Sequence, residues 1–421
     1  MTAWIVCTGE VLPIDPGNQR PLRAGMLCSE LRNRGHQVTW WASTFSHATK
    51  QLRYPRTTAV VVKPGMQLNL LHGRSYRTNV SFRRLENHFE VARDFRRRAE
   101  NVPAPDVILC AWPTIELGVE CVRYGLRHGV PVALDIRDLW PDMFLDAAPR
   151  PLRSLARFAL SPYFRASREA FQGCSAIIGS SEEYLKWGLD NARRARSESD
   201  AVFELGYQEP AYRESELQDA SESLRSLGVD ATRSICWFLG TFGDTYDLRP
   251  VLASARTLQA AGNRSVQFVL SGDGDRRKHW QNRARGLDNV IFTGWLNGSG
   301  IASMMKMAKV GLAAYRKGAP QSLPNKIFEY MAAGIPILSS LSGECVDFLR
   351  AHDCGLSYTP GDGSALLAYL HVLTSNESYR QGLGANALKA FRKYYSAPEL
   401  YGRMAGHLER LTVAAESACT K

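Results

Sequence analysis

Clustered cysteines, long apolar runs and a basic, apolar leader are all missing from this chain of 421 residues. Its nine cysteines are scattered and none forms a C-x-x-C pair, which predicts reduced, mostly buried thiols rather than a disulfide framework or a zinc site. No stretch reaches the ~20 apolar residues that a membrane-spanning helix needs. The opening MTAWIVCTGEVLP lacks the basic start and apolar core of a signal peptide. We therefore expect a cytoplasmic protein that is soluble or lies on a membrane surface.

Positive charge is concentrated in the first half of the chain. Residues 1–200 carry 28 Lys and Arg against 20 Asp and Glu, a net charge of +8, whereas residues 201–421 carry only +3. Residues 74–98 contain eight arginines, and residues 150–168 contain five arginines and no acid among aliphatic and aromatic side chains. Such segments suit an anionic membrane surface. Nucleic acid and a merely solvated basic face are the alternatives.

Short apolar strands alternate with helical stretches along most of the chain, which predicts parallel sheets covered by helices on both faces. The polar residues 191–232 interrupt this pattern, so we place a domain boundary near residue 200. The predicted organisation is an N-terminal domain of residues 1–200, a C-terminal domain of residues 201–395 and an amphipathic helix over residues 396–421. The expected strands are Ala3–Thr8, Gln37–Ala42, Thr58–Lys63, Asp106–Ala111, Val130–Ile136, Ser175–Gly179, Ser234–Leu239, Val266–Ser271, Val290–Thr293, Val310–Tyr315 and Pro336–Ser339.

The segment QSLPNKIFEYMAAG, residues 321–334, carries the most specific chemistry. Its pattern predicts a helix capped by Ser322, with Pro324 in the first turn. A helix amino terminus beside Lys326 suits a diphosphate, and a partly exposed Glu329 one turn later can accept hydrogen bonds from a ribose. A surface ion pair between these two side chains is the alternative.

The stretch LPNKIFEYMAAGIPIL, residues 323–338, resembles the donor-binding segment of the retaining glycosyltransferase family 4, which has the GT-B fold. It is most similar to the branch of N-acetyl-L-fucosamine transferases of O-antigen and capsule assembly. The resemblance implies two Rossmann-like domains whose parallel sheets face across a cleft, with a C-terminal helix that returns toward the first domain. Further segments that match in order are Arg32–Lys50, Asp135–Phe144, Phe238–Leu252, Phe268–Arg277 and Asn289–Leu296.

The resemblance also assigns roles in the second domain. Glu329 matches the second glutamate of an E-x7-E motif and would hold the donor ribose. Gln321 stands where the first glutamate of that motif contacts the transferred sugar, and it offers hydrogen bonds without charge. The backbone from Ser322 through Leu323 to Asn325 would face the diphosphate. Trp295 and Leu296 would bind the nucleobase. The alternative is that Trp295 is a core residue.

Two departures from the family pattern concern phosphate binding. The turn from Gly240 to Gly243 lacks the arginine and lysine that clamp the diphosphate in many family members. Some cation is expected, because the leaving nucleoside diphosphate gains charge as the glycosidic bond breaks. Lys326 is the candidate replacement, with Arg249 and Lys317 as weaker ones.

In the first domain, the loop from Glu10 to Arg23 stands where the family has a glycine-rich loop, and offers Gly17 and Asn18. Arg137 and Asp138 end an apolar strand. The resemblance places Arg137 where the wider family has a histidine that touches the donor sugar, so these two are the expected catalytic residues, with a structural ion pair as the alternative.

His47 is a further candidate for this site. We reject Asp273 and Asp275 as metal ligands, since they lie in a Gly-rich turn without further oxygen ligands nearby.

The function implied by the resemblance is transfer of a sugar, such as an N-acetylated deoxyhexose, from a nucleotide-sugar donor with retention of configuration. No metal, cofactor or protein nucleophile is expected, and UDP is the favoured nucleotide. The expected acceptor is linked to polyprenyl diphosphate at the inner face of the plasma membrane, in cell-surface polysaccharide assembly, with no nucleic-acid partner. The alternatives are a nucleotide-sugar 2-epimerase of the same fold and a non-enzymatic basic protein that binds membranes or nucleic acid.

Overall fold

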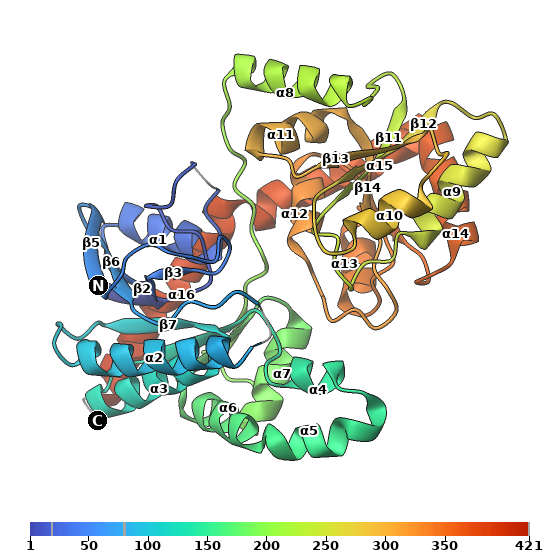
Figure 1. Cartoon of the computed structure of the whole chain (residues 1–421). Coiled ribbons are helices and arrows are strands. Elements are labelled where there is room, and N and C mark those ends of the chain that lie inside the picture. Colours follow the sequence, from blue (N-terminus) through green and yellow to red (C-terminus); the bar gives the residue numbers. More distant parts are fainter. Residues whose placement is uncertain (18–19, 79–80, 420–421) are drawn as a thin grey trace. The chain divides into compact units, whose positions relative to one another are not determined.

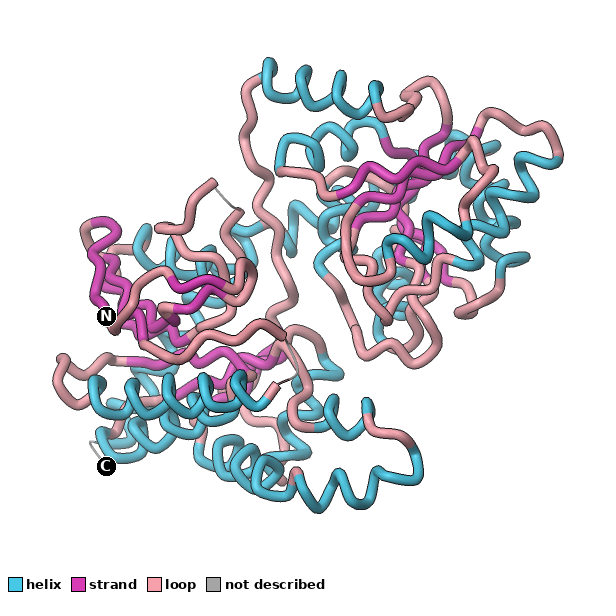
Figure 2. The backbone as a smooth tube through the Cα atoms, in the orientation of Figure 1, coloured by secondary structure: helices cyan, strands magenta, loops and turns pink. Residues whose placement is uncertain are grey.

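The computed structural model describes residues 1–17, 20–78 and 81–419, which form two compact units (Figure 1). Unit 1 comprises Met1–Glu204 together with Leu400–Lys421, and unit 2 comprises Leu205–Glu399. Each unit is a sheet with helices packed on it (Figure 2). The expected α/β architecture of two domains built on parallel strands is confirmed.

The sheet of unit 1 has eight strands in the order β10-β9-β8-β7-β1-β2-β6-β5. All neighbours are parallel except β5 and β6, so the expectation of a fully parallel sheet is wrong at Thr58–Lys63. The reason is the two-residue turn Pro64–Gly65, with φ of +77° at Gly65, which reverses the chain directly into the next strand. The strands are β1 (Thr2–Val6), β2 (Gln37–Ser43), β5 (Thr58–Lys63), β6 (Met66–Leu71), β7 (Val107–Trp112), β8 (Val132–Ile136), β9 (Ala176–Gly179) and β10 (Ala201–Val202), with a separate hairpin of β3 (Phe45–Ser46) and β4 (Gln51–Leu52).

Large aromatic side chains fill the core of unit 1 between the sheet and its helices. Trp4 and Trp41 meet edge to face with ring centroids 5.0 Å apart, and Trp41 and Phe95 meet at the same separation. Tyr124 lies 5.0 Å from Trp4 on the other side. These contacts join two strands to two helices and bury all four rings. The helices are α1 (Arg23–Asn33), α2 (Phe82–Ala99), α3 (Ile115–His128), α4 (Asp142–Ala147), α5 (Arg153–Ala159), α6 (Ser161–Gly173) and α7 (Glu182–Ala192).

The last helix, α16 (Ala397–Cys419), packs on unit 1 although its sequence follows unit 2. Glu409 accepts from His36 Nε2 at 2.8 Å and pairs with Arg34 at 3.3 Å. Arg34 also donates to Gly402 O at 2.8 Å. Leu400, Met404 and Leu408 form its fully buried stripe, together with Ala405.

The sheet of unit 2 has six strands, all parallel, in the order β13-β12-β11-β14-β15-β16. The strands are β11 (Ser234–Leu239), β12 (Val266–Ser271), β13 (Val290–Gly294), β14 (Ala308–Ala313), β15 (Ile337–Ser339) and β16 (Gly355–Ser357). The helices are α8 (Glu214–Ser226), α9 (Arg249–Ala260), α10 (Arg277–Arg283), α11 (Gly298–Met307), α12 (Asn325–Ala332), α13 (Glu344–His352), α14 (Gly363–Ser375) and α15 (Glu377–Ala390), with a π-helical turn at Phe391–Tyr395.

Two expectations from the sequence concern the cysteines and membrane-spanning helices. The eight cysteines whose side chains are described are all buried and free of disulfide bonds. Within the described ranges, no helix combines the length and the apolar composition required to cross a bilayer.

Helix α12 packs so closely on the sheet that only glycine fits beneath it. A Cβ on Gly311, in β14, would lie 2.5 Å from the ring of Tyr330. That ring cannot swing away, since its hydroxyl accepts from Leu239 N at 3.1 Å and lies 3.1 Å from Trp237 O. The position of α12 therefore depends on the glycine.

We expect Gly311→Ala to lower the free energy of unfolding by about 1–3 kcal/mol, the usual cost of overpacking a core. Denaturant titration measures this directly. Gly382→Ala is the control, because a Cβ at that helical position meets nothing within 4 Å and alanine there should be neutral or stabilising by about 0.5–1 kcal/mol. Equal stabilities for the two variants would contradict the close packing of α12.

Candidate functional site

Three loops at one edge of the unit 2 sheet are locked together by backbone hydrogen bonds. They follow β11, β12 and β13, which are neighbouring parallel strands. Gly240 N donates to Ser271 O at 3.0 Å, and Phe242 N donates to Asp273 O at 2.8 Å. Open parallel sheets bind ligands beyond the carboxyl ends of their strands, which makes this edge the candidate ligand site of unit 2.

Glycines are required where these loops touch. Gly272 and Gly274 have φ of +138° and +149°, and a Cβ on Gly272 would lie 1.8 Å from Gly240 O. Between them, Asp273 accepts from Gly274 N at 2.7 Å and pairs with Arg277 at 3.1 Å. Its carboxylate thus stabilises the turn. Throughout the described residues, no group of three or more His, Cys, Asp or Glu side chains is placed to hold a metal ion.

The ammonium group of Lys326 lies in a cage of aromatic rings under the first of these loops. The ring centroids of Phe238, Tyr246 and Tyr315 lie 4.2, 4.1 and 5.1 Å from its Nζ. A Cβ on Gly240 would come within 2.9 Å of the same nitrogen. The side chain therefore ends at the loop where the sequence predicts a diphosphate, and cation–π attraction favours its charged form.

Burial acts against that charge. The residue is only 5% exposed, and desolvation lowers the pKa of Lys326 to about 7, against the opposing attraction of Glu329. Among the described residues, Nζ has no hydrogen-bond partner. A buried amine without a partner is costly, and a bound anion supplies both the missing hydrogen bond and the missing charge.

The start of α12 differs from the sequence expectation. The helix begins at Asn325 with Pro324 at the N-cap, so Ser322 lies too far upstream to cap it and Pro324 precedes the first turn. Ser322 instead donates to Glu344 at 2.8 Å. Glu329 was expected to be partly exposed, but it is buried at 6% exposure, because α12 is covered on all sides from Lys326 to Ala332.

The remaining predicted donor residues lie on two loops of unit 2. Gln321 is half-buried and its Oε1 has no partner among the described residues, while Leu323 is buried and Asn325 exposed. Gly240 and Gly243, both half-buried, flank the turn above the aromatic cage.

Trp295, directly after β13, is 72% exposed, so the alternative of a core tryptophan is wrong. Leu296 beside it is half-buried. Of the weaker cations, Arg249 is held by Asp247 at 2.7 Å and Lys317 is exposed. Lys326 is therefore the cation that the fold brings to the Gly240 turn.

A pocket of about 260 Å³ in unit 1 opens at the carboxyl ends of β1, β2, β7 and β8. It contains the predicted residues Arg137, Asp138 and His47. The other polar groups that line it are Thr8, Glu10, Ser43, Tyr76, Arg84, Asn87, His88 and Thr114.

Arg137 belongs to a buried ion-pair network at the base of this pocket. It pairs with Glu10 and, at 2.9 Å, with Asp135, and Asp135 pairs with Arg23 at 2.8 Å. Glu10 also accepts from Ala24 N at 2.9 Å, at the first turn of α1. This arrangement favours the structural alternative for Arg137. Arg23, the last residue of the predicted loop from Glu10, begins α1 and is buried.

Asp138 is exposed and lines the same pocket. Arg84 lies over the Trp140 ring at 4.7 Å. His47 Nδ1 and Tyr76 Oη form a hydrogen bond of 2.6 Å. Desolvation lowers the pKa of His47 to about 4. Arg84 and Tyr76 were not predicted as site residues. Both belong to the basic segment 74–98, which was interpreted as a membrane-binding surface.

Gly17, another predicted residue, does not line this pocket. Gly17 is exposed, with φ of +91°, on the loop between β1 and α1. Asn18 lies outside the described residues.

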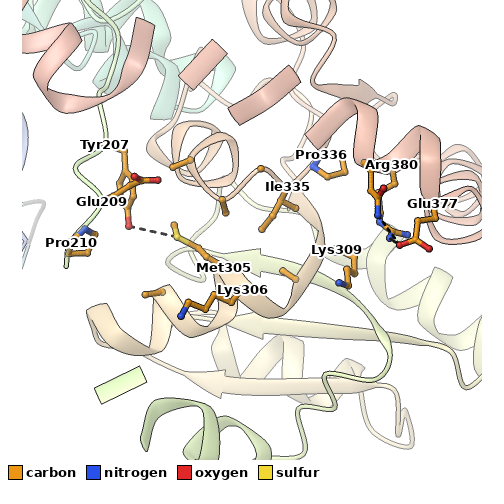
Figure 3. A pocket seen from close by; sticks show the side chains of 16 residues that line it. Tyr207, Glu209, Pro210, Met305, Lys306, Lys309, Ile335, Pro336, Glu377 and Arg380 are labelled. Carbon is orange, nitrogen blue, oxygen red and sulfur yellow. Dashed lines mark hydrogen bonds and ion pairs between the residues drawn. The ribbon is translucent and has the colours of Figure 1, made fainter. Parts of the chain in front are cut away.

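Another pocket of unit 2, of about 430 Å³, is shown in Figure 3. Lys306, Lys309 and Arg380 line it, as does Tyr207, whose hydroxyl donates to Met305 Sδ at 3.8 Å. It lies at the amino ends of β14 and β15, and none of the predicted site residues lines it. It is therefore on the wrong edge of the sheet for the donor.

Residues 233–376 match the family model of glycosyl transferases group 1. The matched segment contains every predicted site residue of unit 2, from Gly240 to Glu329. No curated protein sequence matches the chain.

Solved structures resemble the chain over nearly its whole length. Sucrose-phosphate synthase from Thermosynechococcus elongatus has a TM-score of 0.70 at 16% identity, covering 98% of this chain and 99% of the other. The Anabaena protein HepE in complex with UDP-glucose has a TM-score of 0.66 at 15% identity, with 97% and 100% coverage. The α,α-trehalose 6-phosphate synthase of Burkholderia multivorans has a TM-score of 0.70 at 15% identity, with 100% and 99% coverage. These likenesses confirm the GT-B fold and, with the family match, support a glycosyltransferase.

The buried amine yields a prediction about stability. The pKa of Lys326 is about 7 in the fold and near 10.5 when unfolded, so the unfolded state binds more protons between these values and stability rises with pH across that window. Lys326→Met removes the cost of burying the charge. We expect its unfolding free energy to exceed the wild-type value at pH 7, and the gap to narrow toward pH 10.

Denaturant titrations from pH 6 to 10 measure this gap. Lys317→Met, at an exposed position, is the control and should follow the wild-type curve. A constant gap, or a Lys326→Met variant that is less stable at every pH, would contradict the low pKa of the buried amine.

Proposed function

We propose that this protein is a retaining glycosyltransferase that moves a sugar from a nucleotide diphosphate sugar to an acceptor in cell-surface polysaccharide assembly. The observation that carries the proposal is the amine of Lys326, caged by aromatic rings at the carboxyl end of β11 and without a hydrogen-bond partner in the described chain. It lies within the segment that matches the glycosyl transferases group 1. A diphosphate at the Gly240 turn supplies the partner that this amine lacks.

In this proposal, the other donor groups surround the diphosphate. The backbone amides that open α12 face it, with the positive end of the helix dipole behind them. Glu329 binds the ribose, Gln321 the hydroxyls of the transferred sugar, and Trp295 with Leu296 the nucleobase. UDP is the favoured nucleotide, and the UDP-glucose bound by HepE supports that choice.

The reaction gives the leaving diphosphate additional negative charge. An amine with a pKa of about 7 becomes fully protonated beside that charge, so its stabilisation is greatest in the transition state. We propose that no metal and no protein nucleophile take part, and that the leaving phosphate helps to deprotonate the acceptor hydroxyl. The pocket of unit 1 holds the acceptor.

We further propose that the acceptor is a lipid linked to polyprenyl diphosphate and that unit 1 binds an anionic membrane from the cytoplasmic side. The supporting feature is α5, which has no buried residue in its seven. Leu152, Leu155 and Phe158 are 52%, 66% and 77% exposed beside Arg153 and Arg157. Exposed apolar side chains next to arginines are typical of a helix that lies in a membrane interface.

A 2-epimerase that acts on the nucleotide sugar would also bind UDP. It releases UDP without an acceptor, whereas a transferase releases UDP from a UDP-sugar only when an acceptor is added. Turnover with and without a membrane lipid extract therefore separates the two activities.

The experiment that tests the donor site is UDP binding measured by calorimetry between pH 7 and 9, where the phosphates of UDP are ionised. Because binding requires the protonated amine, we expect the affinity to fall by up to about tenfold for each pH unit above 7. Lys326→Met should bind UDP about 10- to 100-fold more weakly at pH 7, in line with about 1.5–3 kcal/mol for a charged hydrogen bond, and without this pH dependence. Uridine should bind both proteins equally. An identical pH profile in the variant would remove Lys326 from the site.

Membrane binding is tested by co-sedimentation with vesicles. We expect binding to vesicles of phosphatidylglycerol but not of phosphatidylcholine, weakened at high salt. The double variant Arg153→Glu and Arg157→Glu should reduce binding roughly 30-fold or more, since each arginine contributes about 1 kcal/mol. Arg225→Glu with Arg264→Glu, both exposed in unit 2, is the matched control and should bind as the wild type does. Binding that ignores lipid charge would count against the proposal.

A further inference from the structure

A second cavity of unit 1, of about 500 Å³, lies between α2, α3 and α6. These helices lie on the same side of the sheet (Figure 1). The walls are predominantly apolar, and the volume falls within the ~300–1,000 Å³ typical of small-molecule sites. The apolar side chains that line it are Phe89, Ala92, Ile115, Val119, Pro162, Tyr163 and Ala166. We refer to this cavity as the α2–α3–α6 groove.

Charged side chains also line the groove, and several of them are paired with one another. Arg123 pairs with Glu120 at 3.1 Å and with Glu169 at 2.8 Å. Glu116 lines the groove with a side chain that is 9% exposed, and desolvation raises the pKa of Glu116 to about 7, against the opposing hydrogen bond from Tyr163. Its Oε1 has no partner within the described residues. A carboxyl group that is half neutral at pH 7 interrupts an apolar wall much less than an ionised one.

The groove and the acceptor pocket share a wall. His88 lines the pocket, Glu116 lines the groove, and His88 Nδ1 lies 3.7 Å from Glu116 Oε2. Thr114 of the pocket is followed directly by Ile115 of the groove. The pocket and the apolar groove are therefore neighbours, separated by the side chains of His88 and Glu116.

The rim of the groove matches a membrane rather than water. Phe89 is 56% exposed, and Arg93 and Arg96 stand exposed on the same helix. Helix α5, with its exposed leucine and phenylalanine side chains, runs through Leu160 directly into α6, which forms one wall. Exposed apolar side chains and arginines therefore occur both on α5 and along the groove, where Glu90 and Glu169 are also present, as on a surface that meets lipid head groups.

We propose that the α2–α3–α6 groove binds the hydrocarbon chain of the lipid-linked acceptor while its polar head lies in the neighbouring pocket. This inference rests on the proposed function and identifies how the acceptor is selected: by an apolar chain joined to an anionic head. A water-soluble sugar would leave the groove empty. A chain of this kind would be drawn from the bilayer along α5 without crossing water.

The test uses alkyl phosphates as probes, below their micelle concentrations. We expect dodecyl phosphate to bind the full-length protein at least 30-fold more tightly than butyl phosphate, since burial of added methylene groups increases affinity. Ala166→Trp fills the groove and should abolish that preference while leaving butyl phosphate binding unchanged. Phe89→Ala removes an exposed wall residue without disturbing the core and should reduce the preference several-fold. Ala59→Trp, on the exposed edge strand β5, is the matched control.

Dodecyl phosphate with a terminal diazirine locates the chain. Photolabelling of peptides from α2, α3 and α6, lost in Ala166→Trp, is the expected result. Equal binding of the two alkyl phosphates, labelling elsewhere, or a groove closed by dimerisation of the chain would each overturn the proposal. Stabilisation by UDP, measured on the same variants, should be unaffected, because the donor residues lie in unit 2. In the wild-type protein, absence of the alkyl preference with UDP binding intact would reject the groove alone, whereas absence of UDP binding would reject the glycosyltransferase.

Discussion

The proposed donor site of unit 2 depends on an ammonium group that three aromatic rings hold under a glycine turn. Its rings come from β11, from the loop before α9 and from the end of β14, while α12 supplies the amine. The packing of Tyr330 against Gly311 fixes that helix, and the interlocked loops fix the turn above it. Together, these elements exclude water from the amine and hold it close to the Gly240 turn, and this burial lowers its pKa to about 7.

In unit 1, by contrast, the buried charges are paired with one another. Arg23, Arg137, Asp135 and Glu10 neutralise one another beneath the pocket, and the amides of α1 complete the shell around Glu10. Breaking one member of such a network leaves its partner buried and unpaired, which costs more than the network contributes. The strand ends are thereby held rigid, and the residues that remain open to a ligand, such as Asp138, line the pocket above them.

The alternation of strands and helices predicted most strands of both sheets, and local spacing predicted the body of α12 but not its N-cap, because these patterns depend on neighbours in sequence. The aromatic cage of Lys326 could not be predicted in this way, since its members are separated by up to 88 positions and share no periodicity. Helix α8 was missed because, among its Glu- and Ser-rich residues, only Leu224 is buried. The reversed direction of β5 depends on a single turn, and the burial of Arg23 on a carboxylate more than a hundred residues away.

The return of α16 to unit 1 imposes an order on biosynthesis. Unit 1 buries Leu400, Met404 and Leu408 of the last helix, so its core stays incomplete until those residues have left the ribosome. Unit 2 is a single continuous segment and is complete earlier, although its sequence begins later. During synthesis, the half of the molecule made first is therefore the half that finishes folding last. Until then, the apolar surface of unit 1 that α16 covers stays exposed.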